Sequence, residues 1–85
     1  MAPTISEFYG IRIVVALKQK EHNPPHVHAF YSGDEAKFLI STGEKIKGDF
    51  PKTGCRFVKQ FILKYKKELM EMWETGTYKK LPPIE

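Results

Sequence analysis

Apolar and polar positions alternate through much of the first half of the chain, with the period of two that is typical of half-buried β-strands. Residues 11–17 carry isoleucine, valine or leucine at every odd position, which predicts a first strand. Residues 26–31 predict a second strand, and the turn Ser32-Gly33-Asp34 predicts a hairpin leading to a third strand at about residues 35–41. Residues 45–49 are a candidate for a short fourth strand, so the prediction is three to four strands.

The period changes near Pro51, where apolar residues begin to recur at spacings of three and four. The members of this stripe are Val58, Phe61, Ile62, Tyr65, Leu69, Met72 and Trp73. They predict one amphipathic helix of roughly five to six turns, ended by Gly76. Residues 3–10 are interpreted as a lead-in to the sheet. The predicted fold class is therefore α+β: a small antiparallel sheet of three to four strands with one long C-terminal helix packed on one face.

Composition narrows the classes of protein to which the chain can belong. With 85 residues, the chain is expected to form a single domain over residues 1–85. The single cysteine excludes an internal disulfide, and no apolar run approaches the length of a membrane span, so we expect a soluble, cytoplasmic protein with no membrane partner. The net charge of +4 permits binding to phosphates or to an acidic protein without requiring it.

The predicted helix has a second face that is not simply polar. Basic residues and two apolar residues cluster there: Lys52, Arg56, Lys59, Leu63, Lys66, Lys67 and Met70. Such a face is usually a solvated surface, but Leu63 and Met70 lie seven residues apart and on the side away from the core stripe. They suggest a partner helix or a homodimer contact as the alternative.

All three histidines of the chain, His22, His26 and His28, fall within seven residues, on either side of Pro24-Pro25. Two consecutive prolines make a rigid extended corner. Because side chains alternate along a strand, His26 and His28 are expected on one face, roughly 6.5–7 Å apart. His22, across the corner, can return as a third imidazole.

Three interpretations of this histidine corner remain open. In the first, His26 and His28, assisted by His22, perform acid–base cleavage of RNA, because histidine populates both protonation states near neutral pH. In the second, the same three histidines bind zinc or another transition metal together with Glu21 or Glu35. The main expectation is that the protein has no cofactor, and the metal is the alternative. In the third, the histidines only stabilise the corner, and the protein is a non-enzymatic module that binds another protein. Whether the chain is an enzyme is left undecided.

The chain resembles a family of small bacterial and archaeal proteins known as domain of unknown function family 4160. The residues that carry the resemblance are Pro3-Thr4-Ile5-Ser6, Phe8-Tyr9-Gly10-Ile11, His22, Pro25-His26-Val27-His28, Ala36, Glu68-Leu69, Trp73-Glu74 and Ile84-Glu85. The resemblance implies a small β-sheet with a C-terminal helix. It further suggests that this protein is the toxin-like member of a toxin–antitoxin-like gene pair. Its expected partners are then a small cognate protein from an adjacent gene and, as a possible second partner, RNA. It supplies no catalytic residues to transfer.

Overall fold

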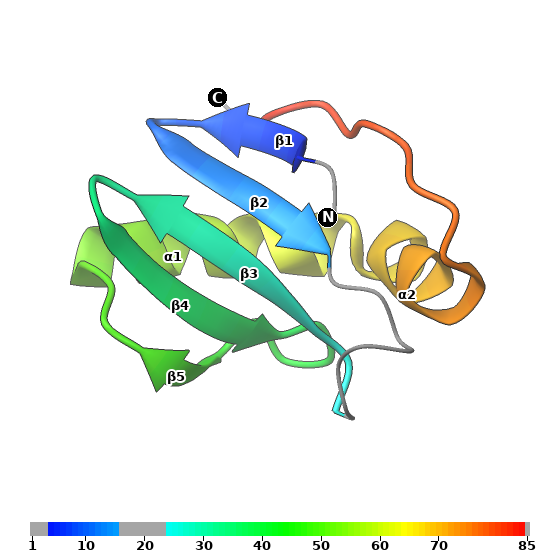
Figure 1. The fold of residues 1–85 in the computed structure, drawn as a ribbon, viewed down its shortest axis with the longest axis horizontal. Helices are drawn as coiled ribbons and strands as arrows, with labels where there is room; N and C mark the ends of the chain where they lie inside the picture. Colours follow the sequence, from blue (N-terminus) through cyan, green and yellow to red (C-terminus); the bar gives the residue numbers. More distant parts are fainter. Residues whose placement is uncertain (1–3, 16–23, 85) are drawn as a thin grey trace.

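The computed structural model describes residues 4–15 and 24–84, which form an antiparallel sheet with helices on one side (Figure 1). Five strands pair in sequence order across the sheet. They are β1 (Thr4–Phe8), β2 (Ile11–Val15), β3 (His26–Tyr31), β4 (Asp34–Leu39) and β5 (Lys45–Gly48). The predicted α+β class and antiparallel sheet are confirmed.

Two hairpins are closed by turns of only two residues, Tyr9-Gly10 and Ser32-Gly33. All four turn residues have positive φ, as type I′ turns require. Glycine adopts this conformation without steric cost, whereas Tyr9 (φ 51) and Ser32 (φ 47) do not. The hairpin predicted at Ser32-Gly33-Asp34 is confirmed. The backbone of Tyr9 is therefore strained, which raises the question of what its side chain contributes.

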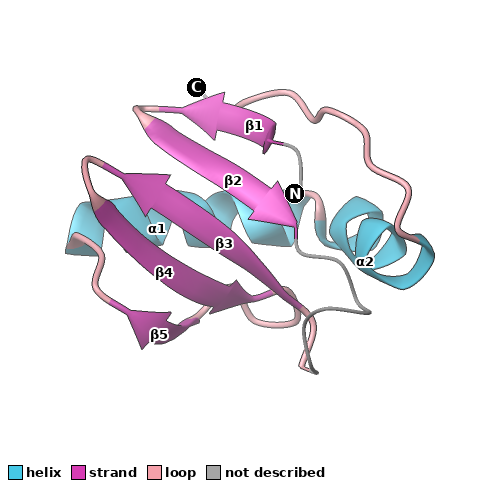
Figure 2. Ribbon diagram, viewed as in Figure 1, coloured by secondary structure: helices cyan, strands magenta, loops and turns pink. Residues whose placement is uncertain are grey.

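Alternate residues of the sheet form one continuous apolar face. The fully buried members on β2, β3 and β4 are Ile11, Ile13, Val15, Val27, Ala29, Ala36 and Phe38. The helix α1 (Lys52–Lys64) lies behind the sheet in Figure 2 and contributes Val58, Phe61 and Ile62 to the same core. Among the described residues, no helix lies in front of the opposite face of the sheet, and the side chains that alternate with the core residues lie on this face.

The prediction of three to four strands is wrong, because it omits β1, the first of the five strands. Residues 3–10 are interpreted as a lead-in, whereas the structure forms β1 from residues 4–8. The pairing of β1 with β2 shifts register between Thr4 and Ser6, and this irregularity allows Ile5 and Phe8, three residues apart, both to enter the core. A period-two search cannot recognise a strand that contains such a shift.

The prediction of one long helix is also wrong, because the chain bends at Tyr65 (φ −113, ψ 27) and continues as α2 (Lys66–Thr75). Hydrogen bonding persists through the bend, since the Tyr65 N–H donates to the Phe61 carbonyl and the Leu69 N–H to the Tyr65 carbonyl. The apolar spacing therefore continues unbroken in the sequence. The change of direction brings Leu69 and Trp73 of α2 into the same core as α1.

Gly76 ends α2 in the left-handed conformation, as predicted. The tail then returns along the body to β1, as Figure 1 shows. The Leu81 N–H donates to the carbonyl of Ile5 at 2.8 Å, and the Leu81 side chain is buried in the core. The tail thus covers part of the β1 edge. Within the described residues, no helix is long and apolar enough to cross a membrane.

Candidate functional site

His26 is buried at the start of β3, with only 4% of its surface exposed. Its Nδ1 lies 3.0 Å from the carbonyl oxygen of Pro24, so the ring nitrogen donates this hydrogen bond. The ring also packs against Trp73 of α2, with 5.1 Å between the ring centroids. His26 therefore connects the proline corner to the C-terminal helix, which is the geometry of a structural residue.

His28 lies two residues further along β3 and has a different environment. Its side chain is 15% exposed, and its Nδ1 lies 3.3 Å from Oε2 of the exposed Glu35 on the neighbouring strand. The ring is 5.2 Å from that of His26 and stacks on Phe30 at 6.4 Å. A carboxylate at this position can fix the orientation of the imidazole through this contact. Of the two histidines on β3, His28 has the better geometry for chemistry.

The third predicted site residue, His22, lies outside the described residues, as does the predicted ligand Glu21. The structure brings His26 and His28 together but leaves the three-histidine arrangement untested. Among residues 4–15 and 24–84, no three His, Cys, Asp or Glu side chains are grouped as a metal site requires. Zinc or another transition metal at the corner stays a prediction.

The open face of the sheet surrounds His28 with side chains of both charge signs. The Arg12 guanidinium lies over the ring of Phe30, 4.6 Å from its centroid, and donates to the Thr4 hydroxyl. Across the strands, Arg12 is opposite Glu7 on one side and Phe30 on the other. These cross-strand neighbours cannot be found without the register, which local sequence patterns leave undetermined.

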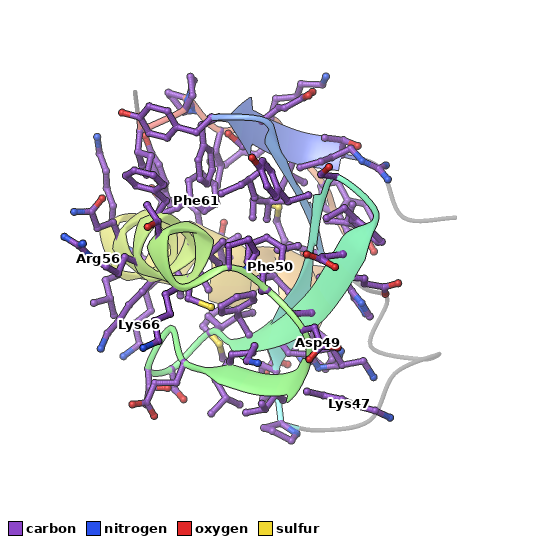
Figure 3. All side chains as sticks on the ribbon, turned by 90° about the vertical axis from the view of Figure 1, so that its left-hand side faces the viewer. Lys47, Asp49, Phe50, Arg56, Phe61 and Lys66 are labelled. Carbon is purple, nitrogen blue, oxygen red and sulfur yellow. The ribbon has the colours of Figure 1, made fainter. Side chains whose placement is uncertain are left out.

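The outer side of α1 and the start of α2 form a surface of one charge sign, which we call the basic face. Its residues are Lys52, Arg56, Lys59, Lys64, Lys66 and Lys67, all exposed. No Asp or Glu occurs between residues 50 and 67, and within the described part of the chain none of the six forms an ion pair. In Figure 3, Arg56 and Lys66 lie on the side of α1 away from the sheet, whereas Phe50 lies between α1 and the sheet.

The bend at Tyr65 separates the two apolar residues predicted to form a dimer contact. Leu63 is half-exposed on α1, among the basic residues. Met70 lies on α2 and is partly buried against the core, so it is less exposed than Leu63. A homodimer through Leu63 and Met70 stays a prediction.

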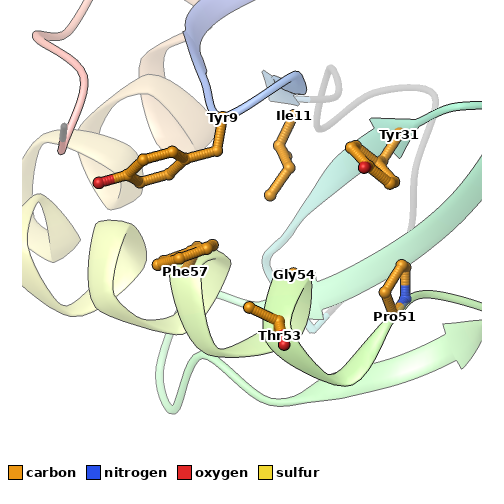
Figure 4. Close-up of a pocket in the computed structure, with 7 residues that line it drawn as sticks. All are labelled: Tyr9, Ile11, Tyr31, Pro51, Thr53, Gly54 and Phe57. Atoms are coloured by element: carbon orange, nitrogen blue, oxygen red, sulfur yellow. The ribbon is translucent and has the colours of Figure 1, made fainter.

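A small pocket lies beside the basic face, between the N-terminal part of α1 and the hairpin turns (Figure 4). Its volume is about 110 Å³, and its lining is mostly aromatic and apolar. The ring of Tyr9 stacks on Phe57 at 4.4 Å on one side, while Tyr31 and Pro51 form the other side. Gly54 also lines the pocket, and a Cβ at this position would lie 2.8 Å from the Phe50 ring, so glycine allows Phe50 to pack closely against α1. This pocket was not predicted from the sequence; the only local signal is a tyrosine directly before Gly10.

A family model described as domain of unknown function (DUF4160) matches residues 10–74, which is most of the chain. The chain belongs to this family. The segment that matches DUF4160 begins just before β2, ends one residue before the end of α2, and includes all three histidines and the basic face. No curated protein and no solved structure matches the chain. Because the family description names no activity, a function has to be argued from the surfaces described above.

Proposed function

We propose that this protein binds a single-stranded nucleic acid, RNA in the first instance, through the basic face, while His26 serves the fold. One observation supports the proposal above all: six exposed cations follow one another without a single acidic residue between positions 50 and 67. Since the whole chain has a net charge of +4, the remainder without these six carries −2. The six residues of the basic face therefore account for the net positive charge of the chain.

Clustered like charges repel one another, and among the described residues no ion pair offsets this repulsion on the basic face. Phosphates of a nucleic acid would supply the missing counter-charge and release condensed cations on binding. Opposite faces of the molecule would then divide the tasks, with the sheet side maintaining the fold and the helix side holding the ligand. Both RNA and DNA present the same phosphodiester chemistry to these lysines and the arginine, so the test includes both.

The test is fluorescence-anisotropy titration of a short labelled single-stranded RNA over a range of salt concentrations. With six phosphate contacts, the slope of log K against log salt is expected to be about −4, from about −0.7 per contact in single strands. The double variant Arg56→Glu/Lys59→Glu should weaken binding on the order of tenfold or more and make the slope shallower. Both side chains are exposed, so the fold is expected to be retained.

The matched control is Lys79→Glu/Lys80→Glu, which changes the net charge by the same amount on the exposed C-terminal tail. It should bind RNA nearly as tightly as the unaltered protein. An equal loss in the control would mean that only total charge matters. Single-stranded DNA, polyglutamate and anionic vesicles are titrated in parallel, and binding of either non-nucleic-acid polyanion as tight as that of RNA would overturn the proposal.

A second candidate function is cleavage of RNA at His28, favoured by the contact between His28 and Glu35. In this hypothesis the imidazole accepts the proton of a 2′-hydroxyl, the resulting oxygen attacks the adjacent phosphorus, and the 5′-oxygen leaves with a proton returned to it. Arg12, which lies over the neighbouring ring of Phe30, would stabilise the negative charge on the phosphoryl oxygens.

Incubation of labelled RNA with the protein in EDTA tests this second candidate. Cleavage should be abolished by His28→Gln, reduced by Glu35→Gln, and preserved in rate per bound RNA by Arg56→Glu/Lys59→Glu. The toxin-like role and the small cognate partner protein belong with this hypothesis: expression should then inhibit growth, and His28→Gln should relieve the inhibition. An RNA that binds but stays intact would reject cleavage and leave the binding proposal standing.

A further inference from the structure

We infer that the pocket formed by Tyr9, Tyr31 and Phe57 receives one unstacked base of the bound strand, which makes the protein selective for single-stranded over duplex RNA. This inference rests on the proposed function and identifies the ligand feature that the basic face cannot distinguish. In the proposed function the lysines and Arg56 of α1 contact phosphates, which duplex and single-stranded RNA share. Only a splayed base can enter a pocket and stack on aromatic side chains.

The position of the pocket fits this role. Thr53, Gly54 and Phe57 line it from α1, the helix whose adjacent face carries Lys52 and Arg56. At 100° per residue, Thr53 is about 60° around the helix from Arg56. A strand whose phosphates follow the basic face therefore passes the mouth of the pocket, and one base can turn inward without leaving the helix.

The lining of the pocket favours a flat ring over other occupants. Tyr9 and Tyr31, with 48% and 39% of their surfaces exposed, are large apolar groups left in contact with solvent beside a surface of lysines. The volume of about 110 Å³ is well below the roughly 300 Å³ or more of sites for larger small molecules. It suits a single ring system held between the Tyr9–Phe57 pair and Tyr31.

The backbone of Tyr9 supports the same conclusion. At φ 51 in a type I′ turn, asparagine, aspartate or glycine would be the residue with least strain. Tyrosine is used instead, and the turn directs its ring over Phe57 at the entrance of the pocket. Strain held by an exposed aromatic side chain is typical of a position kept for binding.

The same preference supplies a clean test, because Tyr9→Asn removes the ring and suits the turn better. Tyr9→Phe is its matched control, since it keeps the ring and loses only the hydroxyl. Binding of a single-stranded RNA and of the corresponding duplex is measured for both variants. We expect Tyr9→Asn to weaken single-strand binding on the order of tenfold, to leave duplex binding unchanged, and so to abolish the preference. Tyr9→Phe should retain it.

Failure of this inference is separable from failure of the proposed function. Single-strand binding that survives Tyr9→Asn unchanged would overturn the base pocket, while its loss in Arg56→Glu/Lys59→Glu would still support the basic face. Adenosine, which carries no phosphate, provides an independent probe: at millimolar concentration it should shift the NMR signals of the Tyr9, Tyr31 and Phe57 rings. Ribose 5-phosphate should not, and an absence of shifts with adenosine would reject the pocket even if RNA binds.

Discussion

The open sheet face and the basic face of α1 lie on opposite sides of the molecule and distribute charge in opposite ways (Figure 3). On the sheet face, charged side chains are used within the fold, as in Arg12 over Phe30 and His28 beside Glu35. On the basic face, among the described residues, the only such contact is Lys64 over the ring of Tyr65 at 5.4 Å. Charges of the first kind contribute to stability, whereas charges of the second kind oppose it slightly.

This difference indicates which surface is kept for something other than folding. Charged residues that repel their neighbours and form no ion pair among the described residues are what the proposed phosphate ligand requires. The sheet face offers residues for chemistry, but each also has a structural task. Variants on the two faces should therefore differ in the sign or size of their effects on stability, and the predictions below test that contrast.

The largest effect is expected at His26. Replacing it with alanine removes the hydrogen bond to Pro24 and empties space against Trp73, which should lower the free energy of unfolding by about 2 kcal/mol. His28→Ala should cost less than about 1 kcal/mol, because the side chain is partly exposed and its partner Glu35 is largely in solvent. Urea unfolding followed by the fluorescence of Trp73, the single tryptophan, measures both.

The order of these two losses decides whether the corner is structural. Equal losses for His26→Ala and His28→Ala would mean that the two histidines share one structural role. A negligible loss at His26 would remove the reason for separating it from the catalytic interpretation. His26→Ala should also leave the affinity for RNA unchanged once the comparison is made at a temperature where both proteins are folded.

Much of the sheet was predictable because its signals are local. Ser32-Gly33 marks a hairpin through the backbone freedom of glycine, and Gly76 marks a helix end for the same reason. The strand at His26–Tyr31 and its alternating faces also followed from residue type and period alone. These features depend on a few neighbouring residues, so no knowledge of the folded chain was needed.

The features that were missed depend on contacts between distant residues. His26 and His28 are equivalent in sequence, and only the packing of His26 against Trp73, 47 residues later in the chain, gives the two histidines different environments. The bend at Tyr65 leaves the three- and four-residue spacing intact, so Met70 could not be separated from Leu63. The aromatic pocket combines two turns and a helix, and Tyr9 gives little sign of it in isolation.

A smaller effect on stability than that of His26→Ala is expected when one arginine on each face is replaced with alanine. Arg12→Ala removes a cation–π contact and a cross-strand neighbour of Glu7, and should lower the free energy of unfolding by about 1 kcal/mol. Arg56→Ala should change it by less than about 0.5 kcal/mol, or raise it, because alanine is a good helix former and one repulsive charge is removed.

Salt makes the paired comparison of Arg12→Ala and Arg56→Ala sharper. At about 0.01 M salt, charges interact over roughly 30 Å, so repulsion along α1 is greatest and any gain from Arg56→Ala should be largest. At about 0.15 M the gain should shrink, whereas the loss from Arg12→Ala should persist because much of it is contact with the Phe30 ring. Thermal unfolding of both variants at the two salt concentrations is the measurement. A loss at Arg56 as large as that at Arg12 would show that the basic face serves the fold, and the main argument for a phosphate ligand would then fail.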